Sequence, residues 1–430
     1  MLVPYRRTRK RREDGETIGW RAGEPDGDLR GDGRIQRRGT QKLRLGQTPL
    51  RENTLQQILI IHYTITVKPT IAITAGDING IGYEVIIKTL ADPHVFEMCK
   101  PVVYGNLKVL KEHASTLSDE YHNLQFQLIL SPKDAKDGRL SLVSCYPDSI
   151  PVAIGQSTPD GGKAAFASLE RACKDLKAGL VDAIVTAPIN KENIQSEQFQ
   201  FTGHTEYLTS VFGEEGQTDS LMMMVSEQMK VALVCNHTPI TKVAQMISEE
   251  RIMRKLTTLN KALKDDFMIR KPRIAVLALN PHAGDNGLIG QEEKTVIKPA
   301  IDKANEQGIM AFGPYSADGF FGAGMYTHFD AILAMYHDQG LIPFKSLDMS
   351  GVNYTAGLPI IRTSPDHGTG YDIAGKNQAD HLSFAHALYM AVDMIKNRAI
   401  TAEINKDPLV IPERVEKDDR PRGPFFVPKD

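Results

Sequence analysis

Residues 331–337 read Ala-Ile-Leu-Ala-Met-Tyr-His, and this stretch decides the fold that the sequence predicts. Its apolar run is short, which is typical of a strand buried on both faces of a sheet. Two other runs have the same form, because Val231–Cys235 leads into His237 and Ile274–Ala278 leads into His282. The sequence therefore predicts three strands that each carry a histidine just beyond the carboxyl end.

The same alternation of short apolar runs and helical stretches continues from Thr66 onward, and it predicts an α/β fold with a parallel sheet covered by helices. The predicted strands are Pro69–Ile73, Pro101–Tyr104, Phe126–Leu130, Ala183–Thr186, Val231–Cys235, Ile274–Ala278 and Ala331–Met335. The predicted helices are Tyr83–Leu90, Gly162–Ala178, Thr205–Val211, Ile240–Leu263, Glu293–Gln307 and Ser383–Asn397.

The three histidines at strand ends form a candidate metal site. In open α/β sheets, ligands bind at the carboxyl ends of the strands, and three neutral imidazoles with an open position suit zinc or cobalt. Each histidine taken singly is equally compatible with a surface residue at a strand end. The shared position of His237, His282 and His337 is what favours a site.

Charge and cysteine content exclude several classes of protein. Residues 1–52 hold 14 Lys and Arg against 8 Asp and Glu, which leaves 37 basic and 45 acidic residues in the rest of the chain. An acidic body gives no basis for binding nucleic acid. The four cysteines have no paired spacing, which fits a reducing cytoplasm. No apolar run approaches the roughly 18 residues of a membrane span, so no membrane partner is expected.

Three loop motifs carry further polar groups. Gly76–Gly82 follows a predicted strand and precedes a helix, which suits either an anion-binding loop or a plain structural turn. His204 and Thr205 open a helix, where a carboxylate or phosphate is favoured, although a simple helix cap explains them equally well. Lys345, Asn353 and Arg362 lie in loops punctuated by Gly and Pro, and the two cations suit a phosphate or carboxylate.

With these segments in hand, the chain resembles the 4-hydroxythreonine-4-phosphate dehydrogenase family across roughly residues 69–397. The matching segments, in order, are ITAGDINGIGYEV, VTAPINKENI, FTGHTEYLT, ALNPHAGDNGLIGQEE, MYHDQGLIPFK and GLPIIRTSPDHGTGYDIAG. The resemblance implies two α/β/α lobes, similar to isocitrate and isopropylmalate dehydrogenases, with the active site in the cleft. It also implies a homodimer with shared active sites, in which one metal ligand comes from the partner subunit.

The resemblance implies an activity as well. The family oxidises 4-phosphooxy-L-threonine with NAD or NADP to 2-amino-3-oxo-4-phosphooxybutanoate, which decarboxylates to 3-amino-2-oxopropyl phosphate in vitamin B6 biosynthesis. One divalent ion per site (zinc, cobalt or magnesium) would serve both steps. Three alternatives stay open: a paralogous dehydrogenase of 4-phosphothreonate or 4-phosphoerythronate, a phosphoacyl transferase on a related fold, and a non-catalytic metal- or nucleotide-binding protein, which the complete set of polar residues disfavours.

Carried over residue by residue, the resemblance assigns most of the site. The implied metal ligands are His237, His282 and His337. The implied substrate contacts are His204, Thr205, Lys345, Asn353 and Arg362. The implied cofactor contacts are Thr363, Asp366, His367, Gly368 and Asp372. Asp338 and Asp285, beside two of the metal ligands, are candidates for orienting a ligand or transferring a proton, and Lys345 is a candidate acid.

We expect four parts along the chain: a disordered or mis-started extension (1–66), a cofactor-side lobe (67–198 with 356–405), a lobe carrying the metal and the dimer contacts (199–355), and a tail (406–430). The first motif departs from the family's GDPAGIGPE pattern, because Ile78, Asn79 and Tyr83 replace Pro, Ala and Pro. These replacements put the rigidity of that loop in question without removing a chemical group.

Overall fold

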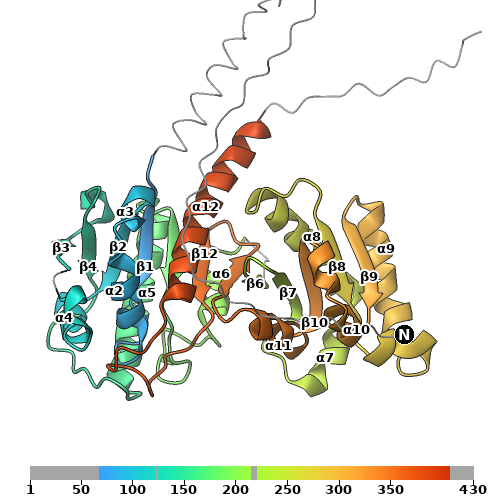
Figure 1. Ribbon diagram of the computed structural model, residues 1–430, viewed down its shortest axis with the longest axis horizontal. Coiled ribbons are helices and arrows are strands. Elements are labelled where there is room, and N and C mark those ends of the chain that lie inside the picture. Colours follow the sequence, from blue (N-terminus) through green and yellow to red (C-terminus); the bar gives the residue numbers. More distant parts are fainter. Residues whose placement is uncertain (1–66, 123, 215–219, 407–430) are drawn as a thin grey trace, which may run out of the picture. The chain divides into compact units, whose positions relative to one another are not determined.

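The computed structural model of the chain describes residues 67–122, 124–214 and 220–406. Within these residues, one sheet of 12 strands carries helices packed against it (Figure 1). The predicted α/β class is therefore confirmed. The extension (1–66) and the tail beyond residue 406 lie outside the described residues, as do the expectations placed on them.

The strands follow the order β3-β4-β2-β1-β5-β12-β11-β6-β7-β10-β8-β9 across the sheet. Their bounds are β1 Thr70–Thr74, β2 Lys100–Gly105, β3 Phe126–Ile129, β4 Leu140–Ser144, β5 Ala183–Thr186, β6 Leu221–Val225, β7 Lys230–Cys235, β8 Arg273–Leu277, β9 Met310–Tyr315, β10 Ala331–Tyr336, β11 Val352–Ala356 and β12 Arg362–Pro365. Every strand predicted from the sequence is present, with its ends displaced by one residue at most.

The expectation of a purely parallel sheet was wrong at its centre. Strand β11 is antiparallel to both of its neighbours, β12 and β6, and β6 is antiparallel to β7. The strands from β3 to β12 and those from β7 to β9 therefore form two parallel groups that run in opposite directions. The sequence did not reveal β4, β6, β9, β11 or β12. Of the two that make the antiparallel pairs, β6 is a run of methionines and β11 contains Asn and Thr.

The three strands that lead into histidines are neighbours. Strand β10 pairs in parallel with β7 on one side and with β8 on the other. Parallel neighbours end at the same edge of the sheet, so the predicted common edge is confirmed for the ends of these three strands.

The helices are α2 Gly82–Leu90, α3 Val95–Met98, α4 Leu107–Ala114, α5 Pro159–Lys177, α6 His204–Phe212, α7 Ile240–Met246, α8 Glu249–Asp265, α9 Lys298–Glu306, α10 Ala317–Gly322, α11 His337–Leu347 and α12 Leu382–Ile404. The shorter turns are η1 Asp119–Tyr121, η2 Pro132–Asp134, η3 Pro281–Gly287, η4 Glu293–Ile297 and η5 Met325–His328. None of the helices in the described part of the chain is both long and apolar enough to cross a membrane.

One predicted helix is in fact two. The expected helix Ile240–Leu263 breaks between α7 and α8, where Ser248 is extended and its hydroxyl accepts a hydrogen bond from the Arg251 N–H. A serine in this position satisfies an N–H group at the start of α8, which favours a new helix over a continued one.

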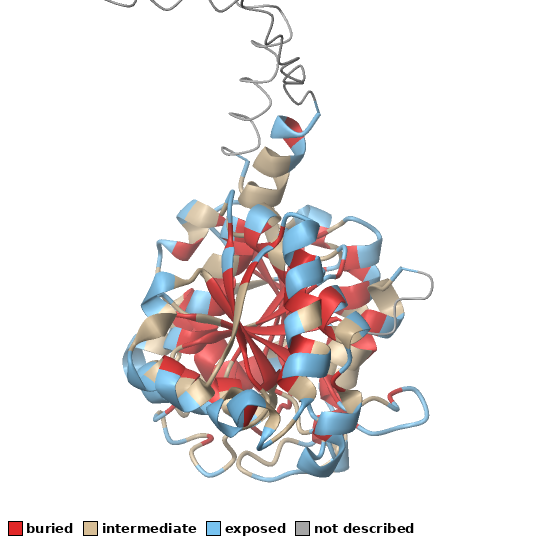
Figure 2. Cartoon of the chain, turned by 90° about the vertical axis from the view of Figure 1, so that its right-hand side faces the viewer, coloured by how far each residue is buried: buried red, intermediate tan, exposed pale blue. Residues whose placement is uncertain are grey.

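The strands form the buried centre of the fold, and the exposed residues lie on the helices and loops around it (Figure 2). Apolar side chains alternate between the two faces of each strand, so the sheet has a hydrophobic layer on each face. With its strands fixed by this burial, the sheet is a rigid base for the loops at its edges.

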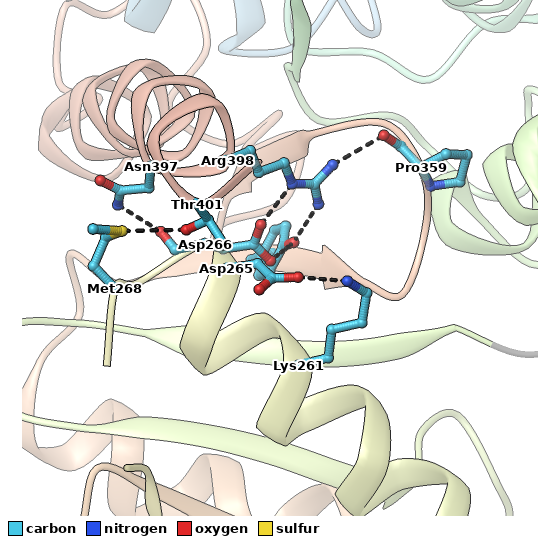
Figure 3. A network of polar contacts seen from close by, with 9 residues as sticks. Lys261, Asp265, Asp266, Met268, Pro359, Asn397, Arg398 and Thr401 are labelled. Carbon is cyan, nitrogen blue, oxygen red and sulfur yellow. Dashed lines mark hydrogen bonds and ion pairs between the residues drawn. The ribbon is translucent and has the colours of Figure 1, made fainter. Parts of the chain in front are cut away.

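A buried ion pair ties α12 to the end of α8 (Figure 3). Arg398 Nε lies 2.6 Å from Asp266 Oδ1, and the Tyr354 hydroxyl donates to Asp266 Oδ2 at 2.5 Å. The Asp266 side chain is only 4% exposed. The carboxylate therefore depends on these two partners in place of water.

Replacing Arg398 by Met is expected to lower the free energy of unfolding by about 3–5 kcal/mol, because it leaves the Asp266 carboxylate buried without a cation. Urea unfolding followed by circular dichroism measures the change. Lys261→Met is the control, since Lys261 and Asp265 form a more exposed pair (78% and 26%) in the same region (Figure 3). Loss of that pair costs about 0–1 kcal/mol. Equal effects of the two substitutions would contradict the prediction.

Candidate functional site

A pocket of about 280 Å³ gathers most of the polar residues singled out from the sequence. Its lining comes from the end of β5, the start of α6, α11, the loop after β7, and strands β11 and β12 with the loop that follows. The predicted site residues in this lining are His204, His237, His337, Lys345, Asn353, Arg362, Asp366, His367 and Gly368. Two larger hollows, of about 610 and 630 Å³, lie beside α8 and contain none of these residues.

Two of the three predicted metal ligands meet in this pocket. His237 follows β7 and His337 follows β10, and their ring centroids are 5.9 Å apart. The Nδ1 atom of His337 lies 2.7 Å from Asp338 Oδ1. A carboxylate that accepts the Nδ1 hydrogen leaves Nε2 unprotonated and free to bind a cation, which is the orienting role expected for Asp338.

The third predicted ligand lies apart from this pair. His282 and Asp285 are exposed residues of the η3 turn after β8, and neither lines the pocket. Among the described residues, no cluster of three His, Cys, Asp or Glu side chains is close enough to hold a metal ion. One copy of the chain therefore brings together two of the three predicted ligands.

Arg362 is a buried cation whose hydrogen-bonding partners are neutral. Its guanidinium donates to the Thr186 hydroxyl at 2.8 and 3.1 Å and to the Thr355 hydroxyl at 3.1 Å. Burial lowers the pKa of Arg362 to about 10, so it is still charged at neutral pH. No ion pair joins it to a carboxylate of the described residues. The Glu206 carboxylate attracts this cation without forming an ion pair, so the charge of Arg362 is only partly compensated. A partly compensated buried charge is costly, and a bound anion would compensate it further.

His204, the first residue of α6, lines the same pocket and is partly buried. Burial, Arg362 and Lys191 together hold the pKa of His204 well below its usual range, so the imidazole is neutral. Its Nε2 atom has no hydrogen-bonding partner. Thr205 follows in the first turn of α6 and is not part of the lining.

Several buried polar atoms without partners lie in or beside this pocket. They include Asn353 Oδ1, His204 Nε2, His367 Nε2, Glu206 Oε2 and Asn236 Oδ1. Buried polar groups in folded proteins are nearly always hydrogen-bonded, and exceptions mark places where a ligand or ordered water binds. The pocket is therefore built to hold a polar ligand.

Lys345 and Asp366 form an ion pair in the pocket, with Nζ 3.0 Å from Oδ1. Burial raises the pKa of Asp366, and Lys345 opposes that shift. Lys345, which we expect to bind the substrate, is therefore in direct contact with Asp366, which we expect to bind the cofactor. The positive charge of Lys345 is therefore already partly compensated by Asp366 before a ligand enters.

The loop after β12 is held against the first glycine motif. The Ile81 N–H donates to the Thr369 carbonyl at 2.9 Å, and the Tyr371 hydroxyl donates to Asp77 Oδ2 at 2.8 Å. Of the expected cofactor contacts, Asp372 lies in this loop but outside the pocket lining, and the Thr363 hydroxyl donates to the Ala387 carbonyl of α12 at 2.7 Å.

The unusual residues of the first motif make structural contacts of their own. The side chain of Asn79 donates to the Thr158 hydroxyl and accepts from the Ala153 N–H, at 2.8 and 2.7 Å. The Tyr83 hydroxyl accepts from the Asn106 N–H at 2.9 Å and bonds to the Tyr146 hydroxyl at 2.6 Å. Hydrogen bonds therefore fix a loop whose rigidity the sequence had put in question.

Sequence reasoning missed Thr186 and Glu206. Thr186 ends β5 and holds the Arg362 guanidinium, while Glu206 Oε1 lies 3.9 Å from His237 Nδ1. The available signals were weak, since a threonine at a strand end and a glutamate in a first helical turn are both common in purely structural roles.

Comparisons with known proteins identify similar chains. A relative from Bacteroides thetaiotaomicron named 4-hydroxythreonine-4-phosphate dehydrogenase is 51% identical over 343 residues, which cover 80% of this chain and 93% of the relative. A relative from Oceanobacillus iheyensis named putative D-threonate 4-phosphate dehydrogenase is 39% identical, over 76% of this chain and 98% of the relative.

A crystal structure of a 4-hydroxythreonine-4-phosphate dehydrogenase from Klebsiella pneumoniae is 33% identical and superposes with a TM-score of 0.66, covering 77% of this chain and 99% of that chain. Residues 97–391 match the family described as Pyridoxal phosphate biosynthetic protein PdxA. From this match, and from relatives that share up to about half of its residues over most of its length, the chain belongs to the PdxA family.

Proposed function

We propose that the chain is a metal-dependent, NAD(P)-linked dehydrogenase that oxidises 4-phosphooxy-L-threonine in pyridoxal phosphate biosynthesis. The secondary alcohol loses a hydride to the nicotinamide and a proton to water, which gives 2-amino-3-oxo-4-phosphooxybutanoate. The carbon–carbon bond to the carboxylate then breaks, carbon dioxide leaves, and a proton takes its place to give 3-amino-2-oxopropyl phosphate. The observation that carries this proposal is the buried Arg362 cation, without an ion pair among the described residues, in the same pocket as His237 and His337.

The pocket has separate groups for an anion and for the reacting end of the substrate. Arg362 is placed to bind a phosphate or carboxylate, because its planar fork matches either anion. Neutral His204 and the side chain of Asn353 have buried atoms free to bond to the substrate. Lys345, with Asp366 to share its proton, is the candidate acid.

The donor set suits a divalent ion such as zinc, cobalt or magnesium. His237 and His337 would hold it, together with His282 from a second copy of the chain, which makes a homodimer with shared sites part of the proposal. Asp338 supports this fit because it fixes the tautomer of His337. When bound, such an ion supplies a Lewis acid that favours the alkoxide before oxidation and the enolate after carbon dioxide leaves.

The cofactor would be NAD or NADP, which accepts the hydride. His367 and Gly368 line the pocket, and the loop that carries them and Asp372 is fixed to the first glycine motif through Ile81. We place the protein in the cytoplasm. Cys99, Cys145 and Cys173 form no disulfide, and burial raises the pKa of the Cys99 thiol to about 12, so this thiol stays protonated.

The proposal predicts NADH or NADPH formation with 4-phosphooxy-L-threonine, loss of that activity with EDTA, and its return when zinc or cobalt is added. The absorbance of the reduced nicotinamide measures all three. Activity that survives thorough removal of metal would contradict the metal assignment. Acyl transfer to phosphate without any nicotinamide reduction would favour a phosphoacyl transferase instead.

The Oceanobacillus iheyensis relative supports a second candidate substrate, D-threonate 4-phosphate, which has a hydroxyl group in place of the amino group. The same assay with this compound and with 4-phosphoerythronate ranks the candidates by kcat/KM. We expect the amino acid to give the highest value. A higher value for either aldonate would change the proposed substrate and keep the reaction class.

A further inference from the structure

The turn that carries His282 has an unusual backbone. Five consecutive residues, 282–286, have left-handed φ angles of 53, 53, 76, 42 and 55°. Gly284 adopts this conformation freely, and Asp285 and Asn286 tolerate it. His282 and Ala283 do not, because their Cβ atoms crowd the following carbonyl oxygen. Other contacts must therefore hold this left-handed turn.

Glu293, the first residue of η4, holds the segment that leads into this turn and packs against Gly284 within it. Its Oε1 accepts hydrogen bonds from the Leu279 and Asn280 N–H groups at 2.9 and 2.7 Å, and its Oε2 accepts one from the Asn280 side-chain amide at 2.9 Å. The residue is only 4% exposed. A Cβ atom at Gly284 would lie 2.6 Å from Glu293 Oε2, so the carboxylate packs directly against the turn.

Within its own copy of the chain, the left-handed turn places His282 away from the other site residues. His282 is exposed, and it lies outside the pocket that holds His237 and His337. Leu288 and Ile289, just after the turn, expose 83% and 45% of their surface. Strained backbone held in place by its surroundings is characteristic of functional sites.

We propose that Glu293 is a positioning residue, which holds the left-handed turn so that His282 is preset for the metal site of a second copy of the chain. This inference rests on the shared site proposed above. Glu293 acts through His282 and touches neither substrate nor metal. Substituting Glu293 in one copy should therefore impair the metal site of the other copy, which receives His282 from the substituted one.

Glu293→Gln tests the first half of the proposal. The glutamine keeps one oxygen for the backbone N–H groups, but its amide group faces the amide of Asn280, so that two donors oppose each other. Glu292→Gln is the control, since Glu292 accepts from the Asn280 side chain and from backbone N–H groups of residues 291 and 292, which lie outside the left-handed turn. We expect amide hydrogen exchange to accelerate at least tenfold over residues 280–289 in Glu293→Gln alone. Unchanged exchange in that variant would overturn the proposal whether or not the site is shared.

Heterodimers test the second half. Two differently tagged variants are co-expressed and purified through both tags, and tightly bound zinc and activity are measured. His282→Ala paired with His337→Ala has one complete site, and about half of the wild-type zinc and activity is expected. Glu293→Gln paired with His337→Ala should match that value. Glu293→Gln paired with His282→Ala should bind zinc about 10–100-fold more weakly than the wild type. In this pair neither copy supplies a well-placed His282 to the site of the other.

The outcomes separate the two ideas. If the reference pair of His282→Ala and His337→Ala gives no recovery, the shared site falls, and the hydrogen-exchange result still decides whether Glu293 holds the turn. If the reference pair recovers and Glu293→Gln also recovers with His282→Ala, Glu293 acts within its own pocket and the positioning role is overturned.

Discussion

His282→Ala is expected to remove tightly bound metal and dehydrogenase activity while leaving the fold intact. The side chain is exposed, so its loss leaves no cavity, and the melting temperature should stay within about 2 °C of the wild type. Loss of a residue that only hydrogen-bonds to a metal ligand lowers the affinity for the metal by about 10–100-fold. Loss of the ligand itself should cost at least about a hundredfold.

Zinc content after dialysis, together with NADH formation, measures this effect. His328→Ala is a matched control, because His328 is an exposed histidine at the end of η5 that belongs to no part of the proposed site. Retention of both zinc and activity in His282→Ala would remove this residue from the metal site. A large fall in melting temperature would instead assign His282 a role in the fold.

Arg362→Met is expected to lower kcat/KM by about 100–1000-fold, since a buried cation that binds an anionic substrate contributes about 2–5 kcal/mol. Arg362→Lys keeps the charge but loses the planar fork, so it should chiefly raise KM. The two variants together separate the contribution of charge from that of geometry. Equal kinetics with phosphorylated and unphosphorylated substrates in the wild type would count against an anion-binding role.

The same substitution should leave the ligand-free protein at least as stable as the wild type. Removing a buried charge that Glu206 compensates only in part relieves its desolvation cost, while the hydroxyls of Thr186 and Thr355 lose one partner each. We expect an unchanged or higher melting temperature in Arg362→Met. A marked decrease would show that the guanidinium supports the fold, and its burial would then need no substrate to explain it.

Local sequence was sufficient for the class of fold and for the ends of the strands. Runs such as Val231–Cys235 and Ala331–Met335 are apolar enough to identify buried strands, and each stops where a polar residue follows. This is why His237 and His337 could be placed at one edge of the sheet. The antiparallel strands β6 and β11 could not be found in this way, because their pairing depends on distant partners.

The candidate site was determined only in part by the sequence. The types of residue and their order along the chain identified Arg362, His204 and the three histidines as chemically suited to an anion and a metal. Only the tertiary structure decided that the guanidinium of Arg362 is buried among hydroxyls, that His282 stands apart from its expected partners, and that Glu293 packs against the turn that carries His282. Burial, the absence of a close ion pair and left-handed backbone at a histidine all depend on tertiary contacts, which local propensity does not encode.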